Sequence, residues 1–230
     1  MTTLGPLVRR SARWGGAFFV LGSLQFIVAM LLVEFLWPST HVSGGPYPTY
    51  SPVSNYISDF GNSNYTHLYW LFNSSIIVLG VLGVLGAVLI RSAFQRKTSA
   101  RLGIAFLIIA SIGAILVGIY PEPSPQLNGN IHSLVSLITF LGSGFALFFL
   151  AFGMFRDTRW DGFRGFTLIL GLVTLIALAI YAPYATNWST AGLVERIIVA
   201  PILLWAIVAG IHLARLPTYA PERFVSHPQN

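Results

Sequence analysis

Six long stretches of the chain are almost free of charged residues, and this feature limits the possible folds more than any other. A helix needs about 20 predominantly apolar residues to cross the hydrocarbon core of a membrane. Turn-forming or charged residues separate the six stretches, as expected at the ends of membrane helices. The sequence therefore predicts an all-α, polytopic integral membrane protein in which residues 1–230 form a single transmembrane domain. The expected spans are residues 14–36, 68–90, 102–120, 132–155, 163–181 and 191–213.

The composition agrees with this interpretation and excludes several other classes. Hydrophobic residues make up 55% of the chain and charged residues only 9%, whereas a soluble chain carries about 25% charged residues. The net charge of +6 is spread between the apolar stretches, so we expect no nucleic-acid partner, which would need basic residues on one face. Because the chain has no cysteine, disulfides, thiolate nucleophiles and thiolate metal ligands are excluded.

The positions of the basic residues predict how the bundle is oriented. Cytoplasmic loops of membrane proteins carry an excess of Lys and Arg. In an arrangement of six helices, every Lys and Arg except Arg196 falls on one side. We therefore expect a multi-pass protein of the cell membrane with both termini cytoplasmic. The first apolar stretch is longer than the core of a signal peptide, about 7–15 residues, so we interpret it as a retained helix.

The longest connection on the predicted outer side, residues 38–67, contains no Lys or Arg and is rich in Pro, Gly, Ser, Tyr and Asn. Long connections are either functional or disordered. Its Tyr and Ile content favours an ordered outer cap between the first and second helices. Asn64 and Asn187 lie in outer N-x-S/T sequons, where a glycan can be attached; the sequence leaves their occupancy open.

One face of the predicted fourth helix is polar. His132, Ser136, Thr139 and Ser143 recur at helical spacing, which places them on one side of the helix. We favour helix packing, in which such side chains form hydrogen bonds across helices. The alternative is that they line a polar cavity or a substrate path.

Most ionisable groups of the membrane part lie near the outer ends of the helices. Charges are costly inside a membrane and often mark functional sites, so these residues are the candidate lining of a polar pocket. The candidates are Asp59, His67, Asn73, Glu122, His132, Ser136, Glu195 and Arg196.

Three interpretations of this group remain open. The acidic residues and Arg196 would pair and hold the cap in place. His67 and His132 would be weak candidate ligands for a divalent metal in a zinc-type hydrolytic site, although their spacing matches no tight metal motif and we predict no cofactor. Arg196 would alternatively bind an anionic group such as a lipid phosphate or carboxylate.

Three segments resemble an uncharacterised membrane family, domain of unknown function 998. They are Asn55-Tyr56-Ile57-Ser58-Asp59-Phe60-Gly61, the turn Tyr120-Pro121-Glu122 followed by His132, and Gly192-Leu193-Val194-Glu195-Arg196. The resemblance implies a six-helix integral membrane protein of the bacterial and archaeal type, without an assigned activity. Glu122 stands where the family pattern has Asp. A more distant similarity in layout to the Frag1/DRAM/Sfk1 proteins implies lipid-related roles.

The functional hypothesis from the sequence is a membrane protein whose outward-facing polar pocket binds a lipid or another amphiphile. The alternatives are a membrane-embedded hydrolase or transferase, with or without a metal, a small-solute transporter, and a structural subunit of a membrane complex. Membrane lipids are the expected partners, and a second copy or a membrane-complex partner is also compatible with the sequence. These sequence patterns identify no catalytic residues.

Overall fold

The computed structural model describes residues 5–43, 49–95, 97–123, 130–181 and 189–216. This part of the chain contains six long helices and no β-strand, and each of the six is long and apolar enough to cross a membrane. The prediction of an all-α, six-helix protein is confirmed. The long helices are α1 (Pro6–Thr40), α2 (Tyr69–Ile90), α3 (Thr98–Ile119), α4 (Ile131–Gly153), α5 (Phe163–Tyr181) and α6 (Ala191–Arg215). The short 3₁₀ helices are η1 (Ser58–Gly61), η2 (Arg91–Ala93) and η4 (Thr158–Trp160).

The first helix is longer than the hydropathy of the sequence predicts. α1 has 35 residues, starts with Pro6 at its first position and includes Pro38. At a rise of about 1.5 Å per residue it is about 50 Å long, which exceeds the roughly 30 Å of a hydrocarbon core. Proline is well tolerated at a helix start, where its missing N–H has no partner to lose. α1 is therefore longer than a helix that crosses the apolar layer without tilt needs to be.

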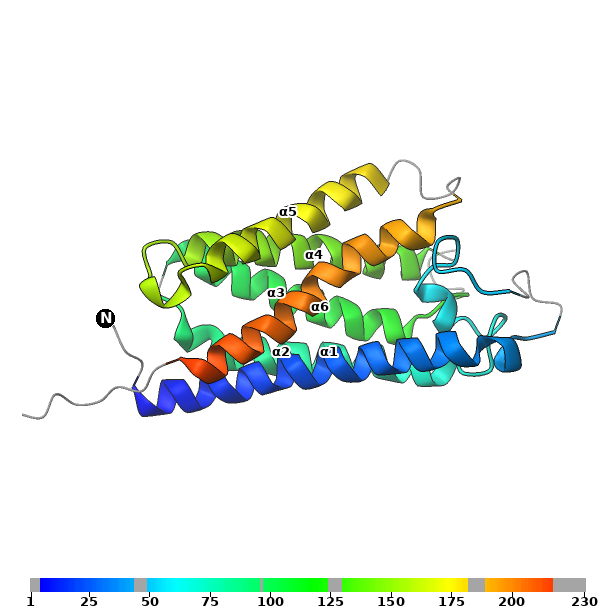
Figure 1. Ribbon diagram of the computed structural model, residues 1–230, viewed down its shortest axis with the longest axis horizontal. Coiled ribbons are helices and arrows are strands. Elements are labelled where there is room, and N and C mark those ends of the chain that lie inside the picture. Colours follow the sequence, from blue (N-terminus) through cyan, green and yellow to red (C-terminus); the bar gives the residue numbers. More distant parts are fainter. Residues whose placement is uncertain (1–4, 44–48, 96, 124–129, 182–188, 217–230) are drawn as a thin grey trace, which may run out of the picture.

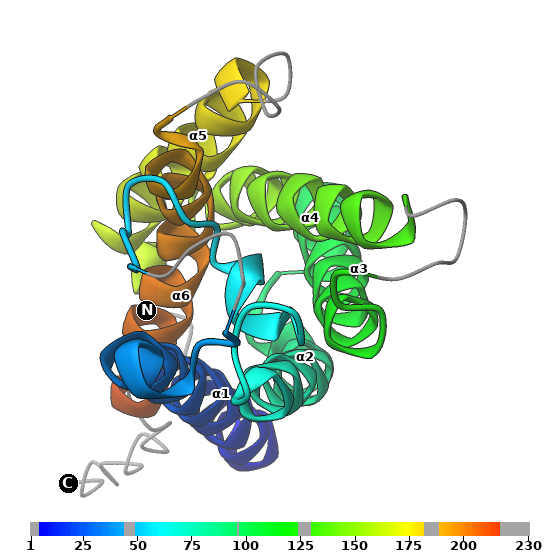
Figure 2. The ribbon, with the colours of Figure 1, turned by 90° about the vertical axis from the view of Figure 1, so that its right-hand side faces the viewer.

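The six helices form a ring in sequence order. Each helix packs against the next one, and α6 closes the ring by packing against α1. Seen along the bundle (Figure 2), α5 is farthest from α1 and α2. The connection between α1 and α2 lies at the end opposite to the start of α1 and the end of α6 (Figure 1). We call these the cap end and the basic end; the side of the membrane that each faces stays a prediction.

Glycines allow the helices to approach closely. A Cβ atom on Gly210 would lie 2.4 Å from the carbonyl oxygen of Gly16 on α1, and one on Gly80 would lie 2.5 Å from that of Ser111 on α3. In a membrane, small residues at helix contacts permit such packing. The glycines of α2 and α6 are therefore packing residues.

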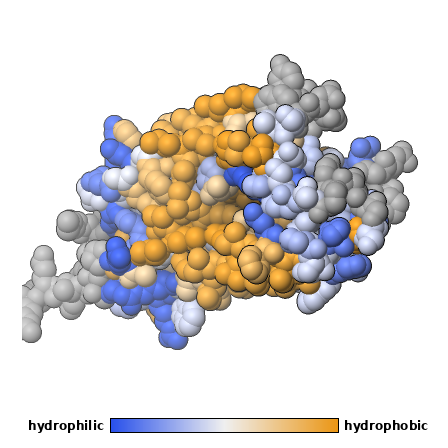
Figure 3. All heavy atoms as spheres, turned by 45° about the vertical axis from the view of Figure 1, so that its right-hand side comes forward, coloured by the Kyte–Doolittle hydropathy of each residue, from blue (hydrophilic) through white to orange (hydrophobic). Residues whose placement is uncertain are grey.

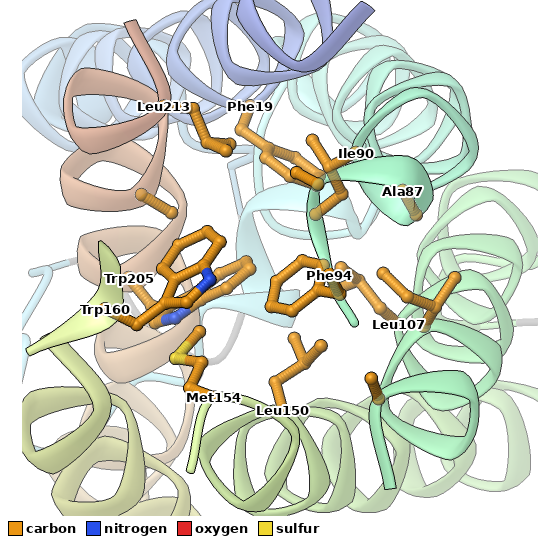
Figure 4. Packing of buried hydrophobic residues seen from close by; sticks show 14 of the residues in the cluster. Phe19, Ala87, Ile90, Phe94, Leu107, Leu150, Met154, Trp160, Trp205 and Leu213 are labelled. Atoms are coloured by element: carbon orange, nitrogen blue, oxygen red, sulfur yellow. The ribbon is translucent and has the colours of Figure 1, made fainter. Parts of the chain in front are cut away.

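Aromatic side chains fill the ring at the basic end (Figure 4). Phe94 stacks on Trp160 with 4.8 Å between ring centroids, and Trp205 lies in the same buried cluster. An ion pair of 2.6 Å joins Arg159 to Asp157, and the Arg159 Nη2 group donates to the carbonyl of Ala93 at 3.0 Å. The turns between helices are thus locked together, and the interior of the ring is closed at this end.

The outside of the bundle is apolar along its middle. Large hydrophobic side chains on all six helices are exposed, and they form a band between two more hydrophilic ends (Figure 3). Lipid chains would cover this band, because a soluble monomer rarely exposes such an area. The structure agrees with a multi-pass membrane protein.

Candidate functional site

The described part of the α1–α2 connection, residues 49–68, is folded over the cap end, and we call it the cap. Its Ile57 and Phe60 are buried in a cluster with Trp37 of α1 and Phe72 of α2. The Phe60 ring lies 5.9 Å from the Trp37 ring and 5.7 Å from the Phe72 ring, both at steep angles. The ordered cap that the sequence predicts is therefore present in these residues, whereas residues 44–48 lie outside the described part.

The last residues of the cap are tied to α1 and α2. The Asn73 side-chain amide donates to the carbonyl of Gly61 at 3.0 Å. The backbone N–H of His67 donates to the carbonyl of Thr40 at 2.8 Å, and the His67 side chain is exposed. Asn73 and His67 line none of the cavities described below, so the structure gives them roles in joining the cap to the helices.

The start of α6 holds the other side of the cap. The Arg196 Nη1 group donates to the carbonyl of Asn55 at 2.8 Å and to that of Gly192 at 2.9 Å, and its Nη2 group donates to the hydroxyl of Tyr50. The Glu195 Oε2 atom accepts the N–H of Ile57 at 2.5 Å. The Arg196 guanidinium therefore binds the cap rather than an open space, which does not favour its use as an anion-binding fork.

Asp59 organises the cap from within. Its Oδ2 atom accepts the backbone N–H of Tyr56 at 2.9 Å and the side-chain amide of Asn55 at 3.2 Å. The residue is only 3% exposed. Burial is the largest cause that raises the pKa of Asp59 from its usual value to about 6, and the bonds from Asn55 and Tyr56 oppose this rise.

We expect the parent protein to lose stability when the pH is raised from about 5 to about 7.5, and we expect Asp59→Asn to lose less. Because the pKa of Asp59 is raised in the folded state, its contribution is present below the unfolded pKa and is lost as the pH rises through about 6. The whole effect is at most about 3 kcal/mol, of which about 1.4 kcal/mol falls between these two pH values. An Asn side chain still accepts both hydrogen bonds but does not ionise. Thermal unfolding of both proteins in one detergent at the two pH values measures the difference. An unchanged pH dependence in the variant would contradict this role.

A cavity of about 400 Å³ opens below the cap, between α4 and α5, and we call it the mouth. Its wall combines carboxylates, an imidazole, hydroxyls, aromatic rings and one aliphatic side chain. The lining residues are Tyr56, Ser58, Glu122, His132, Ser133, Ser136, Leu137, Phe140, Tyr181 and Glu195. Four of the predicted pocket residues, Glu122, His132, Ser136 and Glu195, thus meet here.

Two smaller inner cavities of about 80 Å³ each follow the mouth toward the middle of the bundle. The first shares His132, Ser136 and Glu195 with the mouth, and the second shares Thr139 and Ser143 with the first. The polar face of α4 therefore borders cavities whose other lining residues are mostly apolar, and helix packing and a polar cavity both remain open as its role. Thr139 also contacts the helix-packing residue Gly113 of α3.

The innermost cavity ends against the aromatic cluster of the basic end. Trp205 and Leu107 line this cavity and belong to the buried cluster. The hydroxyl of Ser23, which also lines it, is completely buried and has no hydrogen-bond partner among the described residues. The two inner cavities thus share lining residues with each other, and the first of them also shares residues with the mouth.

The comparison with known families gives one result. A family model described as "Protein of unknown function (DUF998)" matches residues 20–212. The chain belongs to the DUF998 family. No curated protein and no solved structure matches it. The range that matches the DUF998 model includes the cap and all residues of the mouth, so the candidate site is a part of the family domain.

In this DUF998 protein, His132 has a defined orientation. Its Nδ1 atom lies 2.9 Å from the carbonyl oxygen of Tyr120. Because a carbonyl only accepts, Nδ1 carries the hydrogen, and the neutral ring has its lone pair on Nε2. This Nε2 atom faces the Ser136 hydroxyl at 3.4 Å and Glu122 Oε1 at 4.0 Å. In this tautomer the Nε2 atom can accept a hydrogen bond at the mouth.

The described residues do not form a metal site. No group of three or more His, Asp or Glu side chains in this part of the chain is arranged to hold a metal ion. The exposed His67 and the buried His132 do not line a shared cavity. The geometry therefore gives no support to the two histidines as a ligand pair.

Sequence reasoning missed the aromatic part of the mouth. Tyr56 and Tyr181 share a side-chain hydrogen bond that joins the cap to the end of α5, and Phe140 of α4 contributes to the wall beside them. Desolvation by burial raises the pKa of Tyr56 above its usual value. Tyr181 ends an apolar stretch, and an aromatic residue there is equally typical of a membrane interface, so the sequence carried no specific signal.

Proposed function

We propose that this DUF998 protein binds one molecule of a lipid or another amphiphile at the mouth. The polar head group lies among the carboxylates and hydroxyls of the mouth, and the apolar chain extends along α4 and α5 in the membrane. The observation that supports this proposal is the position of the mouth: it is a polar cavity of about 400 Å³ at the edge of an apolar surface.

The side chains around the mouth suit such a molecule. Ligand sites in proteins combine apolar walls with a few polar groups that orient the ligand. Here Glu122, His132 and Glu195 supply polar groups, and Leu137 and Phe140 supply apolar surface. Leu137 is 41% exposed and Ile180 of α5 is 52% exposed, so an alkyl chain that leaves the mouth meets apolar side chains at once.

The buried aromatic cluster at the basic end favours binding over transport. A transporter needs a path to both sides of the membrane, whereas Phe94, Trp160 and Trp205 fill the ring at the basic end. We further propose that the protein lies in the plasma membrane with both termini in the cytoplasm. The mouth then faces the outer leaflet. We therefore propose a binding protein that takes its ligand laterally from that leaflet.

Photolabelling tests the proposal. Three probes share a decyl chain with a diazirine and differ in their head group, which is trimethylammonium, glucoside or sulfate. With protein in vesicles of phosphatidylcholine, at least one probe should label peptides that contain Leu137, Phe140 or Tyr181. Ser133→Trp, at an exposed helical serine of the mouth, should reduce this labelling about tenfold, equivalent to about 1.4 kcal/mol.

Ser74→Trp is the matched control, because Ser74 is an exposed helical serine of α2 that does not line the mouth. It should leave the labelling unchanged. Labelling that is spread evenly over the lipid-facing surfaces of all six helices with every probe, and that Ser133→Trp does not alter, would refute binding at the mouth.

A further inference from the structure

The charges around the mouth have one sign. Its described lining contains the carboxyl groups of Glu122 and Glu195 and neither Lys nor Arg. The sequences of the adjoining segments 124–129 and 182–188, which lie outside the described residues, also lack Lys and Arg. Arg196 directly follows the mouth residue Glu195 in the sequence, but its guanidinium donates its hydrogen bonds to Asn55, Gly192 and Tyr50.

Glu195 has an oxygen that the described protein leaves without a partner. The residue is only 8% exposed, and its Oε2 atom accepts the N–H of Ile57 at 2.5 Å. Its Oε1 atom forms no hydrogen bond with any described residue, and Glu195 lines both the mouth and the first inner cavity. Glu195 Oε1 is not among the fully buried side-chain atoms that lack a partner, so it is accessible from the cavity. A cation in the cavity can therefore contact this carboxylate oxygen.

Aromatic residues complete the wall around the carboxyl groups. Tyr56, Phe140 and Tyr181 all line the mouth, and the hydroxyls of the two tyrosines bind each other. An ammonium group is attracted to the faces of aromatic rings, and cavities with several such rings recognise quaternary ammonium ligands. Carboxylates and aromatic rings together favour an ammonium group over a phosphate or a sulfate.

We propose that the mouth selects a cationic head group of the ammonium class. This inference rests on the proposed binding of an amphiphile at the same site and adds the chemistry of the head group. The ammonium nitrogen lies near Glu195 and Glu122, with the rings of Tyr56 and Tyr181 beside it. An anionic head group would bring like charges together without a compensating Lys or Arg.

The three decyl probes decide between head groups, provided that labelling is compared at equal amounts of membrane-bound probe. We expect the trimethylammonium probe to label the mouth about tenfold more than the glucoside probe, a difference equivalent to about 1.4 kcal/mol, and the sulfate probe to label it least. Unlabelled decyltrimethylammonium should compete for the site. Tetramethylammonium alone should compete weakly, because it lacks the chain; if it competes as well, the ligand is a free ammonium ion and not a lipid.

Glu195→Gln tests the source of the preference. Gln keeps an acceptor for the N–H of Ile57, so the cap stays docked, but it removes the charge. The preference for trimethylammonium over glucoside should fall about tenfold, because only the cationic head group depends on the charge. Glu34→Gln on α1, which does not line the mouth, should change neither value.

The failures of the two proposals are distinguishable. Equal labelling of the mouth by all three probes would overturn the cationic preference and keep amphiphile binding. Stronger labelling by the sulfate probe would overturn the preference in the same way. If no probe labels the mouth and Ser133→Trp has no effect, both proposals are wrong.

Discussion

Gly192→Val is expected to release the cap from α6 and to abolish labelling of the mouth. A Cβ atom at Gly192 would lie 2.0 Å from the carbonyl oxygen of Asn55 and 2.6 Å from its carbonyl carbon. These are backbone atoms that cannot turn away as a side chain would. The same Asn55 oxygen accepts the bond from Arg196, so moving it breaks a second contact between the cap and α6.

The absence of cysteine from the chain makes this prediction easy to measure. Ile57 is 5% exposed under the cap, so Ile57→Cys should react slowly with a maleimide in the parent protein. Adding Gly192→Val should increase the reaction rate at least about tenfold, which corresponds to a shift of about 1.4 kcal/mol in the opening of the cap.

Gly165→Val is the matched control, because a Cβ atom at this α5 glycine meets no atom within 4 Å. It should leave both the maleimide rate at Ile57→Cys and the labelling of the mouth unchanged. A cap that stays closed in Gly192→Val would show that the backbone contact at Gly192 is not needed for docking.

Trp205→Ala should destabilise the bundle more than any change on its surface. Trp205 is 1% exposed, its ring lies 5.7 Å from Phe19, and its indole N–H donates to the Thr167 hydroxyl at 3.1 Å. Truncation of a buried Trp costs about 3–5 kcal/mol. For a chain of this size, this is a decrease in Tm of roughly 10 °C, measurable by thermal unfolding in detergent.

Two further substitutions test whether the loss of the buried ring causes the decrease in Tm. Trp205→Phe loses the hydrogen bond but keeps most of the ring, so its effect should be smaller. Trp14→Ala removes a side chain that is 55% exposed and should change the Tm by less than about 2 °C. A Trp205→Ala protein as stable as the parent would mean that neighbouring helices close the space that the indole leaves.

Hydropathy was sufficient to predict the fold, because each helix must satisfy its own backbone in the membrane. The α5 bounds agree with the expected span, 163–181, whereas α1 extends well beyond 14–36. The extension was not predicted because the charges Arg9, Arg10 and Arg13 end the apolar pattern but not the helix. A charged side chain at the membrane surface costs little and is compatible with helical backbone.

The candidate site was predicted only in part. Glu122, His132 and Glu195 meet at the mouth, but Arg196 turns to the cap although it follows Glu195 directly in the chain. Neighbouring residues of a helix point about 100° apart, so their roles depend on how the helix is rotated in the ring. That rotation follows from contacts between distant segments, which hydropathy and spacing do not contain.

The anchoring of the cap also determines when the site can form. The cap lies between the first two helices, but the bonds that Ile57 donates to Glu195 and that Arg196 donates to Asn55 join residues 138 and 141 positions apart. During synthesis, therefore, α1 and α2 exist long before the segment that holds the cap. A chain that stops before α6 has a cap with unbound polar backbone groups, open to proteases, so a closed cap marks a completely assembled bundle.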